Sequence, residues 1–351
     1  MKIGFVGLGR VTRMFHVPAL RRIPDASVVG GWDAMGEQRT SWQAETGLKT
    51  FTTFEELVAA APEVLVVATP PDSHEEWCIR AVESGFHVIC EKPFVPTAAA
   101  AETVIAAAAA AGRGVAINHQ FREKAIFRTI RERIRTQEFG RLQFCQLWQL
   151  MELAPWDEPT PWRAGMANRV LFEGGVHLVD LMLGFFGERP QAVFARRSAG
   201  YHEQRDADPV HLALLEFSDG RLGQITIDRL CPAATRYLEA RADCERASLR
   251  ASLGGRALVR LGAKRAEATG IHLDYGAGGI AWAERGTKRK TLARSPRDAS
   301  VEATAELMRR ILAAFREGRE PPSSAREARE VIAVIEAAYR SAESGERVEV
   351  S

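Results

Sequence analysis

The chain has 351 residues, of which 46 % are hydrophobic and 26 % are charged, a composition typical of globular proteins, and its length allows two domains. Its formal net charge of +2 gives no general attraction to nucleic acid or to a membrane surface, and no apolar stretch approaches the roughly 20 residues that cross a bilayer. The five cysteines are odd in number, widely spaced and without a C-x-x-C pair, which favours reduced thiols in a cytoplasmic protein over a disulfide framework or a zinc site.

The chain begins with a predicted strand at residues 2–6, a glycine turn and a helical stretch at residues 13–22. This order is typical of a dinucleotide-binding turn, in which the first glycine makes the bend and the second lets the backbone approach a pyrophosphate. The third position of that pattern holds Thr12 instead of glycine, so the match is incomplete, and G-x-G alone is a weak signal. The turn residues that we expect to contact a cofactor are Gly7, Gly9, Arg10 and Val11.

A second predicted strand, at residues 26–32, ends at Asp33, which lies about 24 residues beyond Gly9. An acidic residue at this distance accepts hydrogen bonds from the ribose hydroxyls of adenosine. Ala34 follows, and no basic residue adjoins Asp33 to hold a 2′-phosphate, so the sequence favours NAD over NADP. Arg39 lies further along the chain and keeps NADP possible.

Three more strands are predicted at residues 63–68, 86–90 and 114–118, with helices between them. This alternation predicts a doubly wound parallel sheet through residue 122, with ligands at the carboxyl ends of the strands. His74 begins a predicted helix, where a histidine is as often a packing residue as a ligand contact. The residues that follow these strands and that we expect near a cofactor are Thr69, Pro70, His74, Glu91, Lys92 and Gln120.

Lys92 is the most informative of these residues, because it stands at the end of a predicted buried strand and directly before Pro93. Proline has no amide donor, so the strand should stop as Lys92 reaches the edge of the sheet. A lysine whose stem is fixed and whose amine is partly desolvated can exchange protons near neutral pH. The alternative is a solvated lysine in a strand-to-helix loop.

The pattern changes near residue 123, where a predicted helix at residues 124–137 is followed by strands with polar and apolar residues in alternation. This alternation predicts an α+β domain with an open, mostly antiparallel sheet. The strands are expected at residues 142–152, 191–198, 210–217, 223–230, 238–242 and 247–253. We therefore expect a Rossmann domain at residues 1–122 and a second domain at residues 123–351. Two helices are predicted at the end of the chain, at residues 301–317 and 325–344. The alternative for the last helix is that it packs on the first domain.

The second domain contains one chemically rich stretch, at residues 171–180. Glu173, His177 and Asp180 are four and three residues apart, so in an α-helix they would share one face. A metal triad is conceivable, but no further ligand pair is visible and two glycines lie inside the stretch, so we expect no metal. The alternative is a capped helix with one satisfied histidine.

Together these motifs resemble the Gfo/Idh/MocA oxidoreductases over essentially the full length of the chain. The resemblance implies a Rossmann domain and an open-faced sheet domain that often forms dimer or tetramer contacts. It also implies NAD(P)-linked oxidation or reduction at a sugar or polyol hydroxyl. The motifs are the glycine turn, T-P-x-x-x-H at residues 69–74, E-K-P at residues 91–93, W-R at Trp162 and Arg163, and a D-x-x-x-H-type element at Glu173 and His177.

By the same resemblance Lys92 is the catalytic lysine, His177 is the second acid/base, and Arg163 contacts the cofactor or the substrate. The resemblance also implies that Gly7, Gly9 and Asp33 contact the cofactor. One departure is Glu173, which occupies the position usually held by aspartate and keeps a carboxylate on a longer side chain. Converging from two domains, Lys92 and His177 would share proton transfer and alkoxide stabilisation, while Glu173 orients His177 or binds a substrate hydroxyl.

Three alternatives stay open on the sequence alone. A redox-neutral glycosidase or lyase that retains its NAD would need the same residues, and a non-catalytic NAD sensor would leave Lys92 and His177 without a task. A basic cluster is formed by Lys264, Arg265 and the basic residues at 288–290. It would either hold a nucleotide-sugar phosphate or lie on a solvated hairpin, and we favour the hairpin. We expect a carbohydrate-like substrate and a homodimer or homotetramer, with no nucleic-acid or membrane partner.

Overall fold

The protein divides into two compact units in a computed structural model that describes residues 1–152, 166, 168–198, 208–232, 236–254, 256–261, 269–274 and 278–351. The first unit contains residues 1–123 and 300–336, and the second contains residues 124–299 and 337–351. The sequence places one boundary after residue 122 and assigns the rest of the chain to a second domain, with packing of the last helix, at residues 325–344, on the first domain as the alternative. The structure differs from this assignment at residues 300–336.

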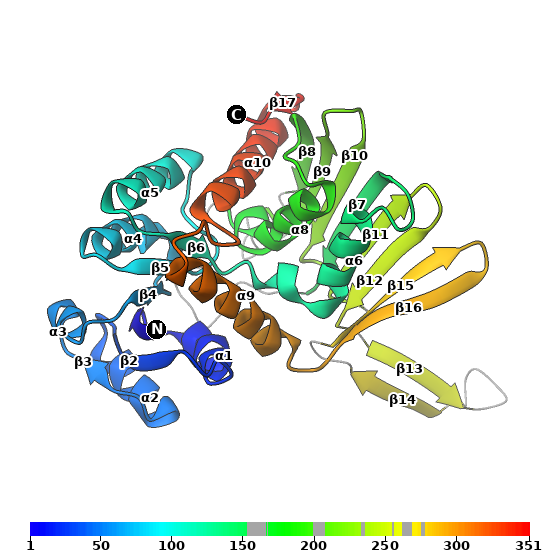
Figure 1. Cartoon of the computed structure of the whole chain (residues 1–351). Helices are drawn as coiled ribbons and strands as arrows, with labels where there is room; N and C mark the ends of the chain where they lie inside the picture. The colour runs from blue at the N-terminus through cyan, green and yellow to red at the C-terminus, as the bar shows by residue number, and fades with distance from the viewer. Residues whose placement is uncertain are drawn as a thin grey trace. The chain divides into compact units, whose positions relative to one another are not determined.

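The first unit is built on a six-stranded parallel sheet with the order β3-β2-β1-β4-β5-β6 (Figure 1). The strands are β1 (Lys2–Val6), β2 (Ser27–Trp32), β3 (Thr50–Phe51), β4 (Val64–Val67), β5 (His87–Cys90) and β6 (Val115–Ile117). The predicted doubly wound parallel sheet is confirmed. Strand order reverses between β1 and β4, and in such sheets ligands bind at the carboxyl edge of this reversal point.

Helices cover both faces of this sheet, so its central strands are buried on both sides. All four residues of β4 are fully buried; Val64 and Val66 belong to one hydrophobic cluster, and Leu65 and Val67 belong to the other. One face is covered by α3 (Phe54–Ala59), α4 (His74–Glu83) and α5 (Ala98–Ala111). The other face is covered by the π-helix η1 (Thr12–His16), α1 (Val17–Leu20), α2 (Gly36–Thr46) and α9 (Ala299–Arg316).

The closing helices explain the difference in domain assignment. In α9, Leu307, Met308 and Ile311 are buried in the cluster that contains Ile3 and Phe5 of β1, so this helix completes the core of the first unit. The next helix, α10 (Ala325–Ser344), begins in the first unit and ends in the second. The sequence alternative concerned the last helix only, and chain order gives no sign that α9 also returns to the first unit.

The second unit contains a nine-stranded sheet with the order β16-β15-β12-β11-β7-β10-β9-β8-β17 (Figure 1). Its strands are β7 (Leu142–Leu150), β8 (Ala192–Ser198), β9 (Val210–Glu216), β10 (Leu222–Asp228), β11 (Leu238–Cys244), β12 (Ser248–Leu253), β15 (Gly279–Arg285), β16 (Lys288–Ser295) and β17 (Val348–Glu349). Neighbours are antiparallel except β7 and β10, which pair in parallel at the centre. The predicted mostly antiparallel sheet is confirmed.

Two helices, α6 (Ala125–Arg135) and α8 (Val176–Phe186), pack against this sheet. Separate from it, β13 (Arg256–Leu261) pairs with β14 (Thr269–Asp274). Lys288, Arg289 and Lys290 begin β16 and are exposed on a hairpin with β15, as the solvated-hairpin interpretation expects. Lys264 and Arg265 lie outside the described residues.

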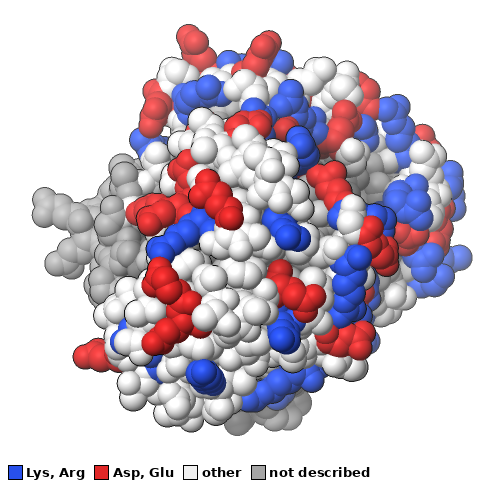
Figure 2. All heavy atoms as spheres, turned by 60° about the vertical axis from the view of Figure 1, so that its left-hand side comes forward, with Lys and Arg blue, Asp and Glu red and all other residues white. Residues whose placement is uncertain are grey.

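Basic and acidic side chains are interspersed over the face drawn in Figure 2. No helix within the described ranges is long and apolar enough to cross a membrane. All five cysteines carry free thiols, and three of them are buried.

Candidate active site

The glycine turn after β1 has two glycines with different tasks. Gly7 has a φ of +87°, and a β-carbon there would lie 2.7 Å from the backbone of Ala68, so only glycine fits. A β-carbon on Gly9 would meet nothing within 4 Å, so this part of the turn borders open space. The geometry fits a turn whose backbone is approached by a pyrophosphate, as predicted for both residues.

Thr12, at the third position of the glycine pattern, closes the turn with its own side chain. Its hydroxyl donates a hydrogen bond to the Gly9 carbonyl oxygen (2.7 Å) and accepts one from Nε1 of Trp42 (3.1 Å). Thr12 is fully buried, so the hydroxyl is satisfied inside the turn. Arg10 and Val11, the other predicted turn residues, are exposed and half-buried, respectively.

Asp33 follows β2 and ties two loops together. Its Oδ2 accepts a hydrogen bond from the Leu8 amide (2.8 Å), and its Oδ1 accepts one from the Met35 amide (2.8 Å). A carboxylate has about four lone-pair sites, so acceptor capacity is left for ribose hydroxyls. The first turn of α2 also brings Arg39 back to this loop, where Nη1 donates to the carbonyl oxygens of Asp33 (2.6 Å) and Ala34 (3.3 Å). A cation therefore lies closer to Asp33 than the sequence spacing suggests.

Lys92 lies just beyond the carboxyl end of β5, at the same edge of the sheet as the glycine turn and Asp33, because these strands are parallel. Lys92 is half-buried, and the Lys92–Pro93 peptide bond is cis. The backbone amide of Lys92 donates to Oε2 of Glu91 (3.1 Å). The carboxylate before Lys92 therefore holds the peptide that carries it.

Glu91 points into the protein and is only 5 % exposed. Nε2 of His16 lies 2.5 Å from its Oε1, and Nδ2 of Asn118 donates to the same oxygen (2.7 Å). Burial acts to raise the pKa of Glu91, but hydrogen bonding and charge from His16, with Asn118 and Lys92, outweigh it and hold this pKa below its usual value. The Glu91 side chain therefore belongs to an interior network, and its predicted contact with a cofactor stays a prediction. Sequence reasoning missed His16 and Asn118.

His74 has a supporting position. It is 1 % exposed, its Nε2 lies 2.8 Å from the Thr69 carbonyl oxygen, and its Nδ1 lies 2.9 Å from those of Pro93 and Phe94. Burial lowers the pKa of His74, against the raising effect of these backbone hydrogen bonds. The side chain thus connects the loops after β4 and β5 from inside, and its contact with a cofactor stays a prediction.

The remaining predicted residues of this edge differ in exposure. Pro70 is exposed and Thr69 is half-buried, with its Oγ1 accepting from Ser73 (2.9 Å). Gln120 is 6 % exposed, and its Oε1, like Oδ1 of Asn118, is buried with no hydrogen-bond partner among the described residues. Buried polar atoms of this kind are normally satisfied, so these two fit an edge that meets a polar ligand. The residues of this edge therefore fit a dinucleotide.

The chemically rich stretch of the second unit forms a π-helix, η5 (Val170–Gly175), that continues into α8. π-helical turns are rare in proteins overall, and those that occur are often found at functional sites. Glu173 lies in the π-helical part and His177 in the α-helical part, so the α-helical spacing that we assumed holds only for the second half. Glu173 and His177 are 9 % and 5 % exposed.

Glu173 has a partner that the sequence did not reveal. Nη2 of Arg229, just after β10, donates to its Oε2 (2.9 Å), and Arg229 is 2 % exposed. A β-carbon on Gly174 would lie 2.9 Å from this Nη2 and 3.2 Å from Oε1 of Gln149, so glycine makes room for both side chains. The glycines that argued against a metal triad thus have a packing role. Within the described residues, no group of three or more His, Cys, Asp and Glu side chains is arranged to hold a metal.

Tyr237 extends this buried polar group. Its hydroxyl accepts from Nε2 of Gln149 (2.6 Å). Burial and the charge of Glu173 raise the pKa of Tyr237 to about 12, with Arg229 acting in the opposite direction. The phenol is therefore neutral at physiological pH. The motif residues Trp162 and Arg163 lie outside the described residues.

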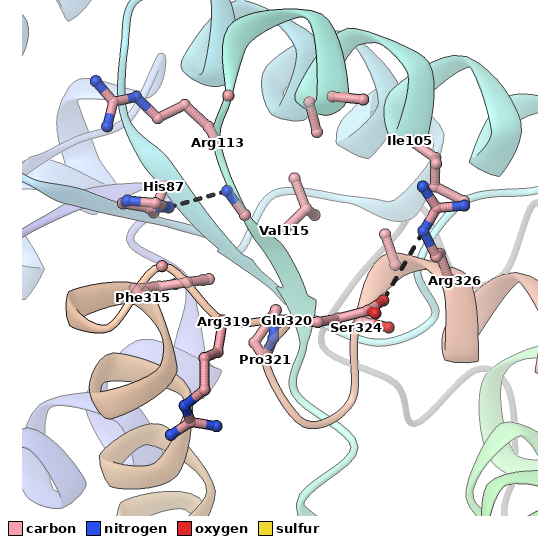
Figure 3. Close-up of a pocket in the computed structure, with 16 residues that line it drawn as sticks. His87, Ile105, Arg113, Val115, Phe315, Arg319, Glu320, Pro321, Ser324 and Arg326 are labelled. Atoms are coloured by element: carbon pink, nitrogen blue, oxygen red, sulfur yellow. Dashed lines mark hydrogen bonds and ion pairs between the residues drawn. The ribbon is translucent and has the colours of Figure 1, made fainter.

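A hollow of about 280 Å³ lies elsewhere in the first unit (Figure 3). It is lined by the starts of β5 and β6, the end of α5 and the loop between α9 and α10. This is the amino edge of the sheet, opposite to Lys92. Figure 3 shows Arg113 and Arg319 directed away from the hollow, while Arg326 faces Glu320 (3.8 Å), so its cations do not converge on a ligand.

Comparison with known families agrees with this geometry. Residues 1–119 match the model of an oxidoreductase family with an NAD-binding Rossmann fold, and residues 127–250 match the Gfo/Idh/MocA C-terminal domain. The chain belongs to the Gfo/Idh/MocA oxidoreductase family.

Individual relatives are distant. The chain is 28 % identical to 1,5-anhydro-D-fructose reductase of Ensifer adhaerens, over 63 % of this chain and 67 % of that protein. It is 25 % identical to D-apiose dehydrogenase of Paraburkholderia graminis, over 99 % and 89 %. With some curated relatives the match spans only 57 or 58 % of their length. An oxidoreductase from Agrobacterium radiobacter, crystallised with NAD⁺, L-tartaric acid and magnesium, has a TM-score of 0.84 at 15 % identity, covering 100 % of this chain and 98 % of that chain, and shares the fold.

Proposed function

We propose that the protein is an NAD(P)-dependent oxidoreductase that transfers a hydride between a nicotinamide cofactor and a hydroxyl or keto carbon of a sugar, polyol or sugar derivative. The observation that carries this proposal is the position of Lys92. It lies at the carboxyl edge of the parallel sheet, beside the reversal point, on a peptide that the buried Glu91 fixes. The glycine turn and Asp33 occupy the same edge.

The relatives support the chemical class. One is named 1,5-anhydro-D-fructose reductase, and another, matched over nearly the whole chain, is named D-apiose dehydrogenase. Both names describe interconversion of a carbinol and a carbonyl on a sugar. The particular substrate of this protein belongs to the same class in our proposal.

In this mechanism the nicotinamide supplies or accepts the hydride, and the protein moves a proton at the substrate oxygen. We assign this proton to the amine of Lys92 and the second acid/base role to His177, with Arg163 as a cofactor or substrate contact. The ion pair with Arg229 compensates the negative charge of Glu173. We therefore assign Glu173 the role of orienting the side chains of the site, and not that of a proton acceptor. Asp33 favours NAD, and Arg39 beside it makes NADP acceptable.

We further propose that the protein works in the cytoplasm as a homodimer or homotetramer through the open face of the second sheet. By register, Trp148, Thr226 and Leu212 form one row across β7, β10 and β9 on this face. Leu212 is 46 % exposed, and a second copy would cover such residues. Light scattering after gel filtration should show that Leu212→Glu reduces the mass. Met35→Glu, which alters a 59 % exposed apolar side chain of the first unit, is the control.

The function is tested by identifying the pyridine nucleotide that the purified protein carries and then measuring NADH absorbance with a panel of sugars and polyols. Oxidation of at least one substrate with added NAD or NADP is the expected result. Product formation without net NADH change would indicate the redox-neutral alternative instead. Binding of NAD without any turnover on the panel would favour a sensor.

A further inference from the structure

The start of η5 is held by side chains from distant parts of the chain. The first amide groups of a helix have no partner within the helix and need an acceptor outside it. The residue before η5, Arg169, makes no side-chain capping hydrogen bond. The acceptors for Val170, Leu171 and Phe172 instead come from the segment before β9 and from the last helix, α10.

The two acceptors are Asp208 and Tyr339. The Val170 amide donates to the Asp208 carboxylate (3.3 and 3.2 Å to Oδ1 and Oδ2). The Leu171 and Phe172 amides donate to the Tyr339 hydroxyl (3.2 and 3.4 Å). The same hydroxyl donates to Oδ2 of Asp208 (2.7 Å), so the two side chains form one connected cap over three successive amides.

His211 completes this group. Its Nε2 lies 2.9 Å from Oδ2 of Asp208, and its ring meets Tyr339 edge-on with centroids 5.0 Å apart. Asp208, His211 and Tyr339 are 0, 1 and 6 % exposed. Burial and the neighbouring Asp208 raise the pKa of Tyr339 above its usual value, so the hydroxyl keeps its proton and remains a donor.

Such a group is costly as a mere helix cap. Burying a carboxylate is unfavourable unless hydrogen bonds and an opposite charge compensate it, and a single serine or aspartate before a helix caps it at the surface without that cost. The group does, however, fix the first three residues of η5, immediately before Glu173, and His177 lies one turn further on. A displacement of about 1 Å in a catalytic group can lower a rate on the order of a hundredfold, so rigid support at this point has a functional effect.

We propose that Asp208, His211 and Tyr339 are positioning residues that fix the element carrying Glu173 and His177, so that the C-terminal helix α10 is part of the active-site framework. This inference rests on the proposed function for its kinetic consequence only. The position of η5 is a structural claim that can be measured in an inactive protein.

The experiment compares Tyr339→Phe with Ser341→Ala, which removes another buried hydroxyl from α10. The Ser341 hydroxyl accepts from the Ala195 amide (2.8 Å) and donates to the Glu346 carbonyl oxygen, so it does not contact η5. Hydrogen exchange of the peptide covering residues 169–177, the melting temperature, and kcat and KM for substrate and cofactor are measured on both variants.

We expect both variants to lose some thermal stability. Only Tyr339→Phe should speed exchange at Leu171 and Phe172 and lower kcat on the order of tenfold, with the KM for the cofactor unchanged. Exchange and kcat equal to those of Ser341→Ala would overturn the proposal. If Tyr339→Phe does not fold, Asp208→Asn is measured in the same way. A wild-type protein without activity would refute the proposed function, and the exchange comparison would still decide the role of Tyr339.

Discussion

Replacing Glu173 by aspartate separates what the family resemblance predicts from what the structure predicts. The resembling family usually has aspartate at this position, so by resemblance alone the change should be tolerated. In the structure the longer side chain reaches Arg229 (2.9 Å) in a buried setting. Aspartate is shorter by one carbon–carbon bond, about 1.5 Å, so its carboxylate would no longer reach the guanidinium at hydrogen-bonding distance.

The expected cost follows from this loss. A hydrogen bond to a charged group contributes about 1.5–3 kcal/mol to the free energy of unfolding. For a domain of this size that corresponds to a decrease in melting temperature of roughly 3–12 °C. We also expect a lower kcat, because the carboxylate of this π-helical residue loses its fixed position. Glu173→Gln keeps the length and loses the charge, so it tests the ion pair without the change in reach.

The assay measures melting temperature and turnover on the same preparations, with Glu216→Asp as the control. Glu216 pairs with Arg347 (2.8 Å), but their side chains are 33 % and 48 % exposed, so the same shortening should cost less than about 1 kcal/mol. If Glu173→Asp is as stable and active as the wild type, the ion pair with Arg229 contributes nothing measurable to stability or turnover. The prediction from the family resemblance would then be the correct one.

Four further predictions concern the first unit and His177. Lys92→Ala should leave NAD affinity within a few fold and lower turnover on the order of a hundredfold or more, and near-normal turnover would remove Lys92 from the mechanism. His177→Ala should cost most of the turnover; full activity in a folded variant would exclude His177 as an acid/base. Asp33→Ala should reduce the preference for NAD in fluorescence titrations, and Arg39→Ala should weaken the binding of NADP more than that of NAD. A wild-type protein that prefers NADP would contradict our interpretation of Asp33. The pKa of Glu91 is lowered from 4.5, so its ionised form stabilises the protein above about pH 4.5, and this contribution is lost as the pH falls through the lowered pKa. Glu91→Gln should therefore flatten the pH dependence of the melting temperature below that value, and an unchanged profile would show that the buried network does not hold Glu91 ionised.

Local features of the sequence determined the main elements of the fold. The strand predicted at residues 63–68 is β4, and the helix predicted between the strands at residues 86–90 and 114–118 is α5, which follows Thr97. The Thr97 hydroxyl caps that helix by accepting from the Ala100 amide (3.1 Å). The alternating pattern of the second domain likewise predicted its antiparallel strands. These features depend on residues a few positions apart, so they can be read without the tertiary structure.

The tertiary structure alone decided what surrounds the candidate catalytic residues. His16 and Glu91 are 75 residues apart, Arg229 and Glu173 are 56 apart, and Tyr339 and Leu171 are 168 apart. Each pair joins a polar group to a partner on another element, and neither periodicity nor spacing along the chain encodes such a contact. A buried charge requires a partner, but the chain can supply it from any element that folding brings close. The sequence therefore identified Lys92, Glu173 and His177 as candidates, and folding determined which side chains hold their segments in place.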